Sequence, residues 1–69
     1  MNRQSVESSN LASIGYDAEN EILEIEFNHG GIYQYFDVPF AVYDELIEAD
    51  SHGQYLAQHI KGKYRYVKV

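Results

Sequence analysis

Apolar and polar side chains alternate along the first half of the chain, and this is the period of a β-strand. The alternation is clearest over residues 21–27, where one face carries Leu23, Ile25 and Phe27 and the other carries Glu24 and Glu26 with Ile22. A weaker alternation over residues 11–16 places Ala12, Ile14 and Tyr16 together and predicts a second strand. Residues 2–10 are polar and rich in serine, which predicts either a short edge strand or a partly ordered tail.

A tight turn is expected at residues 28–31, because Asn28 and His29 are followed by two glycines that can adopt positive φ. The turn predicts a hairpin with the next apolar run, in which a three-residue loop places Phe27 opposite Tyr33 and Ile25 opposite Tyr35. Tyr33 and Tyr35 are two residues apart, so their rings leave the same face of the strand. The strand has to end at Pro39, which lacks an amide donor.

After Pro39 the apolar period becomes that of a helix. Apolar residues fill about half of the circumference and acidic residues fill the opposite arc, namely Asp44, Glu45 and Glu48. Ser51 with Gln54 matches a capping box and predicts a second helix over residues 52–61, which Gly62 ends. Residues 63–69 predict either a final short strand or an extended tail.

These elements predict an α+β fold, with a small antiparallel sheet of three to four strands covered on one face by a helical hairpin. Residues 1–69 are expected to form a single domain, because nothing in the sequence marks a linker or a repeat. The predicted core is Ile14, Tyr16, Leu23, Ile25, Phe27, Tyr33, Tyr35, Val38, Val42, Leu46, Leu56 and Ile60.

Composition narrows the classes of protein that this chain can represent. There is no cysteine among its 69 residues, which excludes disulfides, thiolate metal sites and a thiol nucleophile. No run is apolar enough for a membrane span or a signal peptide, so we expect a cytoplasmic protein. The net charge of −6 opposes general attraction to phosphate, but four of the five basic residues lie in the last nine positions.

Short segments spread over almost the whole chain form a recognisable set: Val6-Glu7-Ser8-Ser9, Ile14-Gly15-Tyr16-Asp17, residues 23–27, Tyr33-Gln34-Tyr35, Val38-Pro39, residues 49–53, and Ile60 followed by Tyr64. In order and spacing this set resembles the KTSC domain family. That family is found alone in bacterial proteins and at the C-terminus of some lysyl-tRNA synthetases, and it carries a tyrosine-any-tyrosine motif near its middle. The resemblance implies no established activity; RNA binding is suggested by the synthetase association.

One position departs from that family's usual pattern. The family often carries an arginine directly after the last helical isoleucine, whereas Lys61 follows Ile60 here. Lysine keeps the charge but lacks the planar fork that binds phosphate through two donors.

The leading functional hypothesis is a non-catalytic module that binds RNA, including tRNA, through the C-terminal segment. This segment interleaves cations with aromatic rings, a combination that suits single-stranded RNA, and its residues are Lys61, Lys63, Tyr64, Arg65, Tyr66 and Lys68. The alternative for these residues is a solvated basic tail. Tyr33 and Tyr35 could also stack bases, but their parity with the apolar strand residues favours a place in the core, as for Val38 and Pro39 of the same motif.

A second hypothesis is a protein-interaction module that uses the acidic helix face or a free strand edge. Enzymatic activity is not expected, because no base is placed near Ser8, Ser9 or Ser51. No metal or other cofactor is expected either. His52 and His59 would lie about 10 Å apart along one helix, too far to share a metal ion, and His29 is in the turn.

Overall fold

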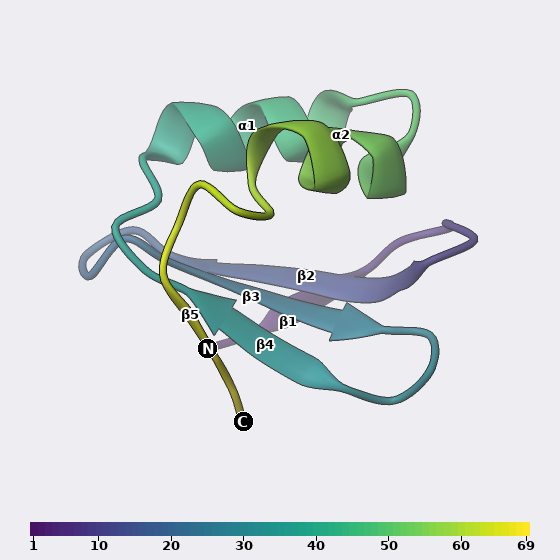
Figure 1. Ribbon diagram of the computed structural model, residues 1–69, viewed down its shortest axis with the longest axis horizontal. Helices are drawn as coiled ribbons and strands as arrows, with labels where there is room; N and C mark the ends of the chain where they lie inside the picture. The colour runs from purple at the N-terminus through teal and green to yellow at the C-terminus, as the bar shows by residue number, and fades with distance from the viewer.

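The chain folds as a five-stranded antiparallel sheet with two helices on one of its faces (Figure 1). The computed structural model describes residues 1–69. The strands lie in the sheet in the order in which they occur in the chain, and both helices come between the last two strands. The elements are β1 (Arg3–Ser5), β2 (Leu11–Asp17), β3 (Ile22–Phe27), β4 (Ile32–Tyr35), α1 (Phe40–Glu48), α2 (His52–His59) and β5 (Tyr66–Lys68).

The predicted α+β class is confirmed, but the predicted number of three to four strands is too low. Both terminal segments that could have been tails are strands: β1 pairs with β2, and β5 pairs with β4. Each has three residues and all six are exposed. The sequence pattern of three exposed residues is too short to predict a strand. These segments pair because β2 and β4 would otherwise leave backbone hydrogen-bonding groups unpaired at the edges of the sheet.

A register shift in β2 changes which residues face the core. Leu11 pairs with Phe27 and Ser13 pairs with Glu26, so Ala12 is an extra residue between them. The simple alternation predicted Ala12 on the apolar face with Ile14; instead Leu11 and Ile14 are both buried. The prediction was wrong at this point because a bulge reverses the parity of every residue that precedes it.

The hairpin between β3 and β4 forms, but its register differs by two residues from the predicted one. Ile25 pairs with Tyr33 and Leu23 pairs with Tyr35. The loop closes where the Phe27 amide donates to the Gly31 carbonyl at 2.8 Å, and Gly30 has a φ of 104°. A shift of two residues preserves parity, so the two tyrosines still share a face with the apolar residues of β3.

The helices begin where the sequence places them. Pro39 is the N-cap of α1, and the Ser51 hydroxyl accepts a hydrogen bond from the Gln54 amide at 3.2 Å at the start of α2. The second helix ends at His59, two residues before the predicted Lys61. The buried core is Leu11, Ile14, Leu23, Ile25, Phe27, Tyr35, Val38, Leu46, Leu56 and Ile60; the other predicted members, Tyr16, Tyr33 and Val42, are partly buried against it.

The face of the sheet away from the helices carries a buried carboxylate. The Glu24 side chain is 10% exposed, and it accepts hydrogen bonds from the Arg3 guanidinium and, at 2.8 Å, from the Gln34 amide. Arg3 also donates to the Ser13 hydroxyl at 2.9 Å, and it can lie across β2 because Gly15 beneath it has no side chain. Hydrogen bonding from Gln34 and Arg3 lowers the pKa of Glu24 despite its burial.

Glu24→Gln is expected to lower the free energy of unfolding by about 1.5 kcal/mol at pH 7, because it removes a charge that accepts two hydrogen bonds. The folded pKa of Glu24 lies below its ordinary value of 4.5, so this contribution is present above that value and is lost as pH falls through the folded pKa. Urea unfolding from pH 7 to pH 3 measures both effects. Glu48→Gln on the exposed face of α1 is the control, and equal stability of the two variants at pH 7 would contradict the expectation.

Candidate functional site

A groove lies between α2 and the sheet, at the end where β3, β4 and β5 run side by side. Its volume is about 660 Å³. The strands supply aromatic rings, and α2 with the turn after it supplies the opposite wall. The lining residues are Asn10, Leu11, Phe27, His29, Tyr33, Tyr35, Gly53, Leu56, Ala57, Lys61, Gly62 and Tyr66.

The sheet side of the groove is a chain of aromatic rings in contact. Strand pairing sets Tyr66 of β5 directly opposite Tyr35 of β4, and their ring centroids are 5.6 Å apart. Tyr66 also lies 5.9 Å from Tyr33, which meets Phe27 edge to face at 5.4 Å. The His29 ring stacks on Phe27 at 5.4 Å, with 3° between the ring planes. The result is a continuous aromatic surface from β5 to the β3–β4 turn.

The three tyrosines of the groove keep their hydroxyl groups free of protein partners. Among the seven tyrosines, only Tyr16 and Tyr55 donate hydrogen bonds, to the Val38 carbonyl and the Glu45 carboxylate. Burial raises the pKa of Tyr35, and the nearby Tyr66 and Tyr33 hydroxyls raise it further. At neutral pH the Tyr35 hydroxyl is therefore a neutral group that can donate or accept a hydrogen bond.

Charge is distributed unevenly around this groove. The chain has eleven acidic residues, and none of them lines the groove. Lys61 does, with its Nζ atom 5.4 Å from the centre of the Phe27 ring and no carboxylate partner. Lys68 pairs with Tyr33 across β4 and β5, so it shares the helix-facing side of the sheet. The groove is thus locally positive on an acidic protein.

The predicted C-terminal cluster is divided by the structure. Lys61 and Tyr66 line the groove, whereas Tyr64 packs against the core. Arg65 is separated from them: its guanidinium lies over the Phe36 ring at 5.1 Å and 3.8 Å from the Asp37 carboxylate, an exposed and weak ion pair.

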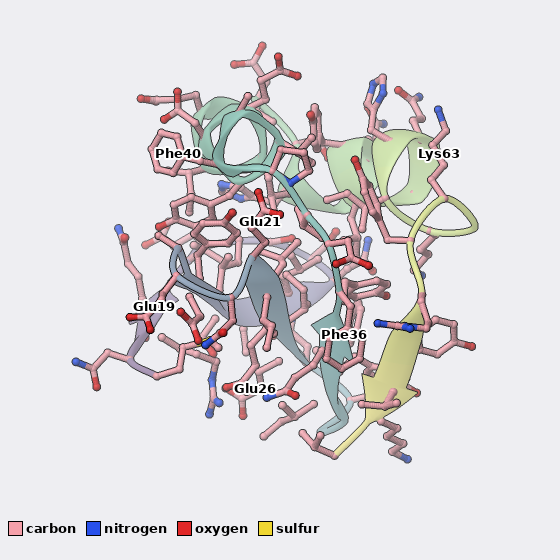
Figure 2. The ribbon with its side chains drawn as sticks, turned by 90° about the vertical axis from the view of Figure 1, so that its left-hand side faces the viewer. Glu19, Glu21, Glu26, Phe36, Phe40 and Lys63 are labelled. Atoms are coloured by element: carbon pink, nitrogen blue, oxygen red, sulfur yellow. The ribbon has the colours of Figure 1, made fainter.

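Lys63 is not among the lining residues, and Figure 2 shows its side chain beside the end of α2, pointing away from the sheet. The six residues therefore do not form one surface. Arg65 directly precedes β5 and contacts Phe36 and Asp37, whereas Tyr66, the first residue of β5, contacts Tyr33 and Tyr35.

The tyrosine motif is also divided. Tyr35 is buried at 4% exposure and Val38 is fully buried, as predicted. Tyr33 is partly buried against the core and also lines the groove. Pro39 is exposed, so the prediction that it belongs to the core is wrong. Pro39 is exposed because it precedes the first turn of α1, where the chain leaves the sheet.

Sequence reasoning missed the roles of Phe27, His29 and Asn10 in the groove. Asn10 lies against Gly53 in the lining, with its side-chain nitrogen 2.6 Å from the place that a Cβ atom on Gly53 would occupy. Gly53 of α2 thus closely approaches the loop before β2, and Ala57, four residues later, also lines the groove. The sequence offered one signal for His29, namely its position in the turn two residues after the core residue Phe27.

Each of the three histidines contacts a different part of the protein. His29 stacks on Phe27, the His52 Nε2 atom is 3.3 Å from the Ile47 carbonyl oxygen, and His59 stacks on Tyr55 at 4.6 Å. No group of three His, Asp or Glu side chains is arranged to hold a metal ion. Neither helix is long and apolar enough to cross a membrane.

Comparison with known proteins finds relatives over the full length of the chain. The KTSC domain profile matches residues 7–64. An uncharacterized protein of Stutzerimonas stutzeri is 46% identical over 70 residues, which cover 100% of this chain and 99% of that protein. The crystal structure of a KTSC domain protein from Yersinia pestis superposes with a TM-score of 0.97 at 43% identity, covering 99% of this chain and 96% of that one.

A lysine–tRNA ligase of Trichormus variabilis is 42% identical over 60 residues. The match covers 87% of this chain but only 11% of the ligase. The shared unit is therefore a small part of that enzyme.

The different burial of Tyr35 and Tyr66 predicts different effects on stability. Tyr35→Ala is expected to lower the free energy of unfolding by about 3 kcal/mol or more, because it leaves a cavity in the core. Tyr66→Ala should cost about 1 kcal/mol or less, because that ring is 55% exposed and loses only ring contacts. Urea unfolding measures both, and equal losses would show that Tyr66 is a core residue rather than a wall of the groove.

Proposed function

This chain belongs to the KTSC domain family, and from that premise we propose that it is a non-catalytic binding module that contacts RNA with the groove between α2 and the sheet. One observation carries the proposal: aromatic rings, free tyrosine hydroxyls and an unpaired lysine line the same groove, and no carboxylate does. Bases stack on such rings, and phosphates are attracted to such a lysine.

Magnitudes favour single-stranded RNA over a duplex. Stacking on an aromatic side chain contributes about 1–3 kcal/mol per base. Phosphate attraction is limited, because Arg3 is bound to Glu24 and Arg65 lies near Asp37, so the free cations are Lys61, Lys63 and Lys68. A duplex exposes phosphates rather than base faces, and it would have to approach a protein of net charge −6.

The choice of tRNA within this proposal is based on one of the relatives. The matched part of a lysine–tRNA ligase is a KTSC-like segment, and the name of that enzyme identifies tRNA as its substrate. We therefore propose tRNA as the RNA that this module contacts, in the cytoplasm. The module itself is proposed to be non-catalytic, because the groove presents tyrosine hydroxyls, one lysine and one histidine but no carboxylate that could act as a paired acid or base.

A second candidate function is protein binding through a strand edge. The sheet ends in β1 on one side and β5 on the other, and both edges are free to pair with a partner strand. The exposed acids of α1, Asp44, Glu45 and Glu48, could attract a basic partner, although Glu45 already accepts a hydrogen bond from Tyr55 at 2.7 Å.

The RNA proposal is tested by titrating the ¹⁵N-labelled protein with tRNA and with a single-stranded oligonucleotide at 50 and 200 mM salt. We expect amide shifts at Phe27, Lys61 and Tyr66, with a logarithmic salt slope of about −2 from up to three phosphate contacts. Reversing the charges of Asp44, Glu45 and Glu48 should strengthen RNA binding and abolish binding to a basic protein. Absence of any salt-sensitive shift at residues 61–68 would contradict the proposal.

A further inference from the structure

The groove has a limited volume and one cation in its lining, features that describe a site for a single residue of a polymer. Asn10 and Gly53 approach each other closely within the lining, and Lys61 is the only lysine or arginine among the lining residues. A volume of about 660 Å³ falls within the usual range for small-molecule sites of roughly 300–1,000 Å³. A long polyanion would need a basic track along its path, and Lys63 and Arg65 point elsewhere.

From these features, and resting on the proposed function, we infer that the groove binds one unpaired nucleotide, with its base against the aromatic rings and its phosphate at Lys61. The base would lie on the exposed ring of Tyr66 and against the apolar wall that Leu56 and Ala57 form on α2. The charge of Lys61 is held beside the ring surface by its position over Phe27, so base and phosphate can be bound together.

The groove also contains groups that can recognise the edge of a base. The hydroxyls of Tyr33, Tyr35 and Tyr66 form no hydrogen bonds within the protein, and the side-chain amide of Asn10 offers both a donor and an acceptor beside Gly53. These groups suit a polar heterocycle better than an aliphatic side chain.

The minimal ligand is then a nucleoside 5′-monophosphate, and the test uses AMP, adenosine and ribose 5-phosphate with the full chain. Chemical shifts of ¹⁵N-labelled protein should move at Phe27, Lys61 and Tyr66 with AMP, and both fragments should bind at least about tenfold more weakly. Lys61→Gln should weaken AMP but leave adenosine unchanged, because it removes only the phosphate contact. Lys63→Gln, a neighbouring lysine outside the groove, is the matched control and should leave both unchanged.

The aromatic contact is tested with Tyr66→Phe and Tyr66→Ala. The first keeps the stacking ring and should retain AMP binding within about threefold, whereas the second should lose about tenfold or more. Loss of AMP binding in Lys63→Gln equal to that in Lys61→Gln would overturn the inference. So would movement of the groove amides by a peptide but not by AMP.

Failure of this inference is distinguishable from failure of the proposed function. If a single-stranded oligonucleotide binds but AMP moves no groove residue, and Lys63→Gln weakens the oligonucleotide as much as Lys61→Gln does, RNA contact stands and the single-nucleotide site is wrong. If neither ligand binds, both are wrong.

Discussion

The structure depends on covering one apolar sheet face with two short helices. Leu46 of α1 and Leu56 of α2 are both buried in the same core as Leu23 and Ile25 of β3. A sheet that is hydrophobic on one side has to be covered in this way to be stable in a chain of 69 residues. Figure 1 shows both helices on the same side, and the groove lies where α2 meets the last strands of the sheet.

The other face of the sheet is stabilised by polar contacts instead of a layer of helices. Arg3, Glu24 and Gln34 come from β1, β3 and β4, and their hydrogen bonds cross the strands. The Ser13 hydroxyl continues this set by donating to Glu26 at 2.9 Å, and Figure 2 shows Glu26 on the side away from the helices. A buried carboxylate is tolerable there because each of its oxygens accepts a hydrogen bond. These contacts tie the N-terminal strand to the sheet.

The groove owes its character to the last strand of the sheet. Without β5, Tyr33 and Tyr35 would be the edge of an apolar face; pairing of β5 adds Tyr66 beside them and brings Lys68 opposite Tyr33. Lys61 reaches the same rings from the end of α2. Two segments separated by a turn thus supply the cation and the ring that the RNA proposal needs. The same short strand leaves an open edge, which is the basis of the protein-binding alternative.

Local chemistry determined much of this protein: the strand period of β3, the turn at Gly30, the break at Pro39 and the Ser51 cap each follow from a few neighbouring residues. Most of the core was also predictable from the sequence, because a two-residue change of strand register leaves the same side chains on the apolar face. Only the tertiary structure decided the bulge at Ala12, the pairing of the terminal strands and the division of the C-terminal cations. Those features depend on contacts between segments that are distant in the sequence. The groove depends on such contacts too, because its residues come from the loop before β2, the β3–β4 hairpin, α2 and β5.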